Sequence, residues 1–179
     1  MKRFLLVLLI AASVILPWFV INSYFSTTPK SMADQVVELV NRERLNAGLS
    51  PFVRNRSLDE AADLKATDMF ERGYWSHNTP DGERPWVFIN ETDYILLDAG
   101  ENLARGYTTA EAVVEGWMNS PSHRELILSD FVDVGVSVQH GELEGEQTTL
   151  IVLFVGVPAD GERPALRVEW TNNFNGIPR

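Results

Sequence analysis

The side chains of two histidines and one glutamate in this sequence could support chemistry at a common site. His77 precedes a turn-rich run, His123 comes two residues after Pro121, and Glu101 lies in a moderately apolar segment. Neutral imidazoles bind Zn²⁺. A nearby carboxylate can serve as third ligand, as general base or as a partner that orients a histidine. Such chemistry requires the three side chains to converge, so it depends on the elements that position them.

His123 stands near the start of a predicted helix. Ser120 can cap that helix, and Pro121 fits its first turn because proline has a fixed φ and no N–H. Ser122 with Glu125 is an alternative capping box. With either cap, His123 lies in the first turn of the helix. There the positive end of the helix dipole favours neutral imidazole, the form that binds a metal or accepts a proton. The plainer interpretation, an exposed histidine in a turn, stays open.

Each of the other candidates also has a plainer interpretation. If its segment is packed, Glu101 must find a cation, a metal or hydrogen-bond donors, and donors from the backbone alone would make it purely structural. His77 by itself is equally well explained as a histidine satisfied in a turn. His140 is expected at the surface, in a polar and acidic hairpin loop over residues 140–146.

Length, charge and composition narrow the class of protein. The 179 residues allow one ordinary domain plus a short appendage, and 45% hydrophobic residues are enough for a core. A net charge of −10 argues against binding to nucleic acid and against an electrostatic hold on anionic lipid. Without cysteine the chain has no disulfide, no thiolate metal site and no thiol nucleophile. It also lacks a Gly-x-Ser-x-Gly elbow and a glycine-rich phosphate loop.

The N-terminal segment has the form of an export signal. Lys2 and Arg3 precede an uncharged run of eighteen residues, 4–21, which is close to the minimum for a membrane span. We expect residues 1–24 to be a signal peptide or an N-terminal membrane anchor, followed by a linker over 25–31. The anchor is preferred because no small-x-small cleavage site stands out. The basic residues stay in the cytoplasm, so the remaining chain is expected to be extracytoplasmic, anchored or secreted.

Hydrophobic periodicity predicts the main elements of the external domain. Three helices are expected: over 31–46, from a capping box that starts at Ser57 to just before Gly73, and over 109–118. Residues 84–89 are expected to form a short helix or an irregular turn. Alternating valines predict a strand over 132–138, and the continuous apolar run 148–157 predicts a central strand.

Three ordered motifs resemble those of the CAP superfamily, which includes cysteine-rich secretory proteins, antigen 5 and pathogenesis-related proteins. They are Ser76–His77 before Pro80–Asp81–Gly82, then Gly100–Glu101–Asn102–Leu103–Ala104, then Trp117–Met118–Asn119–Ser120–Pro121–Ser122–His123–Arg124. The chain is most similar to the cysteine-free prokaryotic branch. The resemblance implies an α+β fold, a three-layer α-β-α sandwich with a central antiparallel sheet, preceded by an N-terminal hydrophobic helix. The CAP domain would span 32–158, with a C-terminal tail over 159–179.

The resemblance also implies a cleft, which in some members binds a divalent metal through two histidines and two glutamates. His77 and Glu101 match one histidine and one glutamate, and His123 matches the histidine of the prokaryotic Ser-Pro-x-His-Arg motif. The second glutamate is replaced by Ser120, and the 148–157 strand carries no histidine. The family's set is therefore incomplete. The implied ligand cleft is His77, Glu101, Asn102, Ser120 and His123, in which the two histidines could hold Zn²⁺ or another divalent cation and Glu101 is the candidate catalytic residue.

Three functions are compatible with this incomplete set. The preferred one is a non-catalytic binding module for a lipid, peptide or cell-wall ligand, because the resemblance implies such binding. The first alternative is a divalent-metal-dependent, protease-like hydrolase that uses metal-bound water as nucleophile. The second alternative is a structural or interaction domain of the cell envelope, in which the three side chains only brace the fold.

Overall fold

The computed structural model describes residues 30–159. The predicted signal peptide or anchor lies outside these residues, as does all but the first residue of the predicted tail. Within the described range, none of the helices combines the length and the apolar character that crossing a membrane requires.

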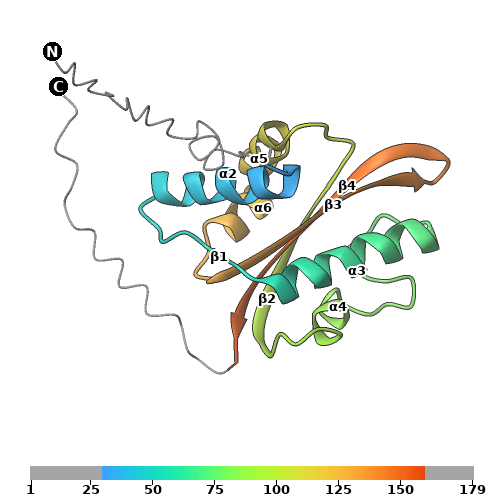
Figure 1. The fold of residues 1–179 in the computed structure, drawn as a ribbon, viewed down its shortest axis with the longest axis horizontal. Helices are drawn as coiled ribbons and strands as arrows, with labels where there is room; N and C mark the ends of the chain where they lie inside the picture. The colour runs from blue at the N-terminus through green and yellow to red at the C-terminus, as the bar shows by residue number, and fades with distance from the viewer. Residues whose placement is uncertain (1–29, 160–179) are drawn as a thin grey trace, which may run out of the picture. The chain divides into compact units, whose positions relative to one another are not determined.

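A four-stranded sheet forms the middle layer of the fold (Figure 1). Its strands lie in the order β1-β3-β4-β2, with bounds Val53–Arg54 (β1), Leu96–Arg105 (β2), Asp133–Leu143 (β3) and Glu146–Pro158 (β4). β4 pairs antiparallel with both β3 and β2, whereas the two-residue β1 runs parallel to β3. The apolar run 148–157 therefore lies in an interior strand, as its composition predicts.

Helices cover both faces of this sheet. Within the described range they are α2 (Met32–Asn46), α3 (Arg56–Arg72), α4 (Trp86–Asn90), α5 (Ala110–Asn119) and α6 (Pro121–Ile127). Side chains of the preceding residues cap three of them by accepting a backbone N–H: Ser31 for α2, Asn55 for α3 and Thr109 for α5. The predicted cap at Ser57 is wrong, because Asn55 accepts from the Ser57 N–H at 2.9 Å and starts the helix earlier.

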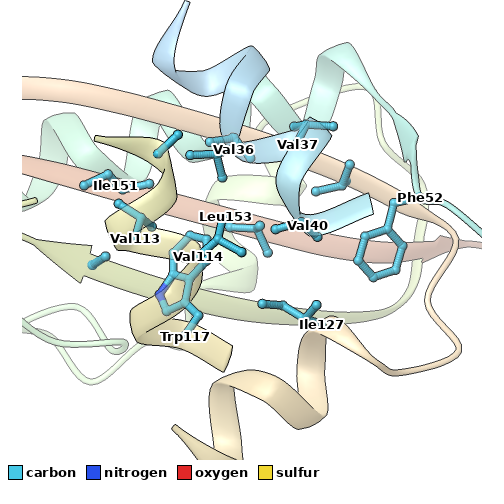
Figure 2. Packing of buried hydrophobic residues seen from close by; sticks show 14 of the residues in the cluster. Val36, Val37, Val40, Phe52, Val113, Val114, Trp117, Ile127, Ile151 and Leu153 are labelled. Carbon is cyan, nitrogen blue, oxygen red and sulfur yellow. The ribbon is translucent and has the colours of Figure 1, made fainter. Parts of the chain in front are cut away.

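The alternation of β4 separates two hydrophobic cores. Ile151, Leu153 and Val155 pack with the buried residues of α2, α5 and α6, among which Trp117 is the largest (Figure 2). Leu150, Val152 and Phe154 point to the other face, where they pack with α3 and α4. Because successive side chains of a strand alternate between faces, one apolar strand supplies both cores. The predicted α+β class and three-layer sandwich are confirmed.

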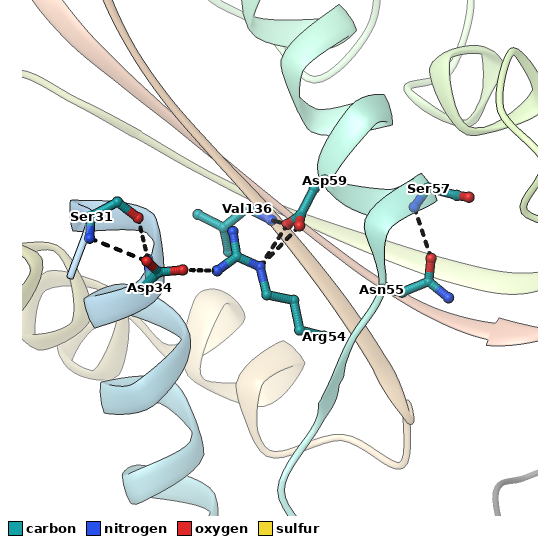
Figure 3. A network of polar contacts seen from close by, with 7 residues as sticks. All are labelled: Ser31, Asp34, Arg54, Asn55, Ser57, Asp59 and Val136. Atoms are coloured by element: carbon teal, nitrogen blue, oxygen red, sulfur yellow. Dashed lines mark hydrogen bonds and ion pairs between the residues drawn. The ribbon is translucent and has the colours of Figure 1, made fainter. Parts of the chain in front are cut away.

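Arg54 on the short edge strand β1 ties two helix starts to the sheet (Figure 3). Its guanidinium forms ion pairs with Asp34 in the first turn of α2 and with Asp59 in the first turn of α3. Asp59 also accepts the backbone N–H of Val136 on β3 at 2.8 Å. Carboxylates in first turns are favoured by the helix dipole, so this network fixes both helices against β3.

The hairpin between β3 and β4 differs from its prediction. The strands continue to Leu143 and resume at Glu146, so only Glu144 and Gly145 form the turn, both with positive φ. Two residues with positive φ match the twist of antiparallel strands and allow this tight connection. The predicted loop over 140–146 is therefore wrong. His140 lies in β3, exposed as expected, and its Nδ1 is 2.8 Å from the Thr149 hydroxyl.

Candidate functional site

His77 and Glu101 form a close pair at the sheet. Nδ1 of His77, from the loop after α3, lies 2.5 Å from Oε2 of Glu101 on β2. The Glu101 side chain is only 2% exposed, whereas the His77 side chain is 58% exposed. A carboxylate that holds Nδ1 orients the ring and leaves Nε2 for another group. The buried Glu101 carboxylate therefore orients the exposed His77 ring and leaves its Nε2 available to another group.

The second carboxylate oxygen of Glu101 has no partner. Oε1 is buried, and within the described range no group donates a hydrogen bond to it. Most buried polar atoms in folded proteins are hydrogen-bonded, so each exception needs a physical reason. An acceptor held ready for a ligand donor is one such reason.

Lys65 supports the pair from α3. It is fully buried, and its ammonium donates to the carbonyls of His77 at 2.8 Å and Ser76 at 3.0 Å and to the Tyr74 hydroxyl at 3.1 Å. Burial lowers the pKa of Lys65, while the charge of Glu101 opposes that decrease. Lys65 thus fixes the backbone that carries His77 and supplies a positive charge near Glu101.

Lys65 was not among the predicted site residues, although the sequence carries a signal for it. The buried face of α3 consists of Leu58, Ala61, Ala62, Lys65, Ala66 and Met69. Lys65 occupies a core position in this otherwise apolar stripe, and a lysine is almost never fully buried unless its charge has partners.

His123 approaches from the other layer of the sandwich. Gly100 and Asn102 face α6: a Cβ at Gly100 would overlap the Leu126 side chain, and the Asn102 amide donates to the His123 carbonyl at 3.1 Å. The missing side chain lets α6 lie close to the edge strand β2. Burial lowers the pKa of His123, and the nearby charge of His77 lowers it further.

The structure thus places the five predicted cleft residues in different roles. Glu101 contacts His77 directly, whereas no hydrogen bond or ion pair within residues 30–159 joins His123 to either of them. Asn102 is buried and holds the backbone of His123. Ser120 precedes α6, with Pro121 in the first turn as expected, but its side chain makes no capping bond. That these five residues bind a ligand remains a prediction.

The geometry gives no support to the predicted divalent-metal site at His77 and His123. Among the described residues, no group of three or more histidine, aspartate or glutamate side chains is arranged to hold a metal ion. Glu101 contacts His77 through Oε2, whereas His123 comes from the opposite layer, where Asn102 donates to its backbone carbonyl. The described residues therefore form no three-ligand Zn²⁺ site, and binding of a divalent cation by His77 and His123 stays a prediction.

The pair is also a proton-binding unit. The hydrogen bond to Glu101 raises the pKa of His77 above its ordinary value of 6.5. Burial raises the pKa of Glu101 above 4.5, although His77 and Lys65 oppose this. In both cases the folded chain holds the proton more tightly than the unfolded chain, so stability decreases as the pH rises from the unfolded-state pKa through the folded-state pKa.

We therefore expect the free energy of unfolding to decrease as the pH rises from 6.5 through the raised pKa of His77, and to decrease less in Glu101→Gln. Because the pKa of His123 is lowered from 6.5, its titration changes the free energy of unfolding only below pH 6.5, outside this range. Urea unfolding of both proteins across this pH range measures the two slopes. Equal slopes would show that Glu101 does not control the proton on His77.

Two shallow surface pockets lie on the α2, α5 and α6 side and share Met118 and Asn119. Neither is lined by His77 or Glu101. Perturbed pKa values and an unpaired buried atom mark functional sites more specifically than a shallow depression does. The candidate site is therefore the pair formed by His77, in the loop after α3, and Glu101 on β2.

The identity of the domain follows from comparison with known families. Residues 37–155 match the model of CAP, the cysteine-rich secretory protein family. The chain belongs to the CAP family. The match includes the whole region from α3 to β3, with the three site residues, so the resemblance read from the three motifs is confirmed.

Two relatives come from Bacillus subtilis (strain 168). The protein YkwD is 37% identical over 115 residues, which cover 63% of this chain and 45% of YkwD. The membrane protein YlbC is 34% identical over 105 residues, which cover 58% of this chain and 30% of YlbC. The aligned part of the chain thus spans less than half the length of either relative.

Solved structures share the fold. An extracellular protein with an SCP domain from Bacillus anthracis str. Ames superposes with a TM-score of 0.61 at 24% identity, covering 70% of this chain and 40% of that one. An outer surface protein from Borrelia burgdorferi gives a TM-score of 0.59 at 22% identity, covering 69% of this chain and 90% of that one. At this level of identity the likeness establishes the common architecture.

Proposed function

We propose that this CAP domain is an extracytoplasmic binding module, and that His77, Glu101 and His123 form its ligand-recognition site. The observation that carries the proposal is Oε1 of Glu101, which is buried and unpaired while Oε2 engages His77. A buried acceptor without a partner costs about 1–3 kcal/mol, and a ligand that donates to it recovers that energy. The ligand would carry a hydroxyl, amide or ammonium donor.

Other groups near the pair suit the same class of ligand. The exposed ring of His77 offers Nε2 as a second polar contact. Trp75, two residues earlier on the same loop, is 38% exposed and adds an aromatic surface. Peptides and cell-wall fragments combine N–H and O–H donors with apolar surface, which favours them over a plain lipid chain.

Support for the extracytoplasmic location comes from the sequence and from the family. Residues 4–21 have the composition of an export signal, and the family is described as secretory. The B. anthracis protein of the same fold is described as extracellular and the B. burgdorferi protein as an outer surface protein. Tethering through residues 4–21 and release after cleavage would both place the binding site outside the cytoplasm.

The proposal is tested with soluble peptidoglycan fragments, measured by the change in melting temperature of wild type, Glu101→Gln and His140→Ala. Glutamine can still accept from His77 but places an N–H₂ group where Oε1 stands, so it repels a ligand donor. We expect a stabilisation of wild type and His140→Ala that is absent in Glu101→Gln. His140, on β3, is the matched histidine away from the pair.

Equal shifts in all three proteins, or none in wild type, would contradict the proposal for this ligand class. A large loss of stability in Glu101→Gln with no ligand effect anywhere would instead favour the envelope-domain alternative. The His77–Glu101 pair also suits general-base hydrolysis. Fragment turnover that stops in Glu101→Gln would therefore favour hydrolysis over simple binding.

A further inference from the structure

An apolar pair is left exposed at the beginning of β2. Ile95 and Leu97 are each 68% exposed, more than any other large apolar side chain in the described range. Leu96 between them packs against the α3 and α4 core, whereas neither Ile95 nor Leu97 belongs to that core. We propose that the chain's own C-terminal segment, residues 160–179, covers Ile95 and Leu97.

The local backbone leaves this pair without a cover. The register between β2 and β4 shifts between Leu96 and Asp98, so Leu97 has no opposite residue on β4. β2 is also an edge strand, with β4 on one side only. An exposed apolar edge is a hazard that proteins commonly cover with another segment.

The C-terminal segment starts beside the pair. The backbone N–H of Ala159 donates to the carbonyl of Ile95 at 2.7 Å, so residue 160 follows next to it. The first large apolar residue beyond is Leu166, seven residues on, which an extended chain places within about 23 Å. Asp160, Gly161 and Pro164 are turn formers that allow the chain to reverse toward β2.

The segment has a pattern that fits an apolar edge. Leu166, Val168 and Trp170 alternate with Arg167 and Glu169, so an extended chain directs the three apolar side chains to one side. A segment bound in this way would leave the two charged side chains on its outer side. Three acidic and three basic residues between 160 and 179 cancel, so the segment is not repelled by a chain of net charge −10.

The test uses trypsin on the full-length protein, because Arg167–Val168 is a cleavable bond inside the covering segment and Arg163 is protected by Pro164. Cleavage requires the segment to open, so the rate reports the open population. We expect cleavage at Arg167 to become about tenfold faster when Ile95 and Leu97 are both replaced by serine. Trp170→Ser should accelerate cleavage at Arg167 by a similar factor. Combining Trp170→Ser with the Ile95 and Leu97 replacements should add little, because both sets of replacements remove the same contact.

Leu45→Ser is the matched control, since Leu45 is 49% exposed on α2 and should leave the rate unchanged. Equal cleavage rates in wild type, the Ile95 and Leu97 double variant and Trp170→Ser would overturn the proposal. So would wild-type protection that disappears on dilution, because a second copy of the chain would then be the cover.

Discussion

Replacing Lys65 with methionine is expected to lower the free energy of unfolding by about 3 kcal/mol, because a buried polar network loses its ammonium donor. Methionine fills a similar volume, so the loss reports polar contacts rather than a cavity. The carbonyls of Ser76 and His77 and the Tyr74 hydroxyl would lose their shared donor. Glu101 would lose a positive charge that lowers its pKa, so its carboxyl would hold a proton to higher pH.

Urea unfolding followed by tryptophan fluorescence measures the loss. Amide hydrogen exchange over 74–77 adds a readout that reports the loop itself, which should exchange faster in the variant. Arg72→Met is the matched control on the same helix. Arg72 pairs with Asp68 and Asp81 at the surface, so its replacement should lower the free energy of unfolding much less than Lys65→Met does. Similar losses in the two variants would show that Lys65 is not a buried anchor of the site.

Replacing Arg44 with methionine is expected to cost about 3 kcal/mol or more, for a related reason on the other side of the sheet. Arg44 is 3% exposed, and its guanidinium lies 3.6 Å from the centroid of the Phe52 ring. It donates to backbone carbonyls after α2 and around the end of α6: Ser50 at 2.8 Å, Ile127 at 2.7 Å, Ser129 at 2.8 Å and Phe131 at 3.4 Å. Burial lowers the pKa of Arg44 to about 10.

The same unfolding measurement applies, with two comparisons. Arg42→Met, an exposed arginine on the same helix paired with Glu38 at 3.6 Å, should cost less than about 1 kcal/mol. Arg44→Lys should recover little stability, because one ammonium cannot reproduce the planar fork that reaches four carbonyls. A lysine variant as stable as wild type would show that charge alone, rather than the guanidinium geometry, holds the loop after α6.

Most of the helices and strands were predictable because they depend on local patterns, whereas the three-layer arrangement was predicted from the family resemblance. The apolar run 148–157 and the valine alternation before it predicted the two long strands, and helical spacing predicted α2, α3 and α5. β2 was not predicted as a strand, since Gly100, Glu101 and Asn102 interrupt any apolar alternation. Each of these three residues has a tertiary role instead: close approach of α6, the partner of His77, and a bond to His123.

By itself the sequence determined the family, the central apolar strand and the three candidate site residues, because periodicity and motif spacing are carried by the chain in order. Only the tertiary structure decided how those residues meet. It paired Glu101 with His77 and left Oε1 unpartnered within the described residues. It placed Lys65 beside the pair and brought His123 from the opposite layer. Contacts between segments far apart in the chain depend on how the two layers pack on the sheet, and no local pattern encodes that packing.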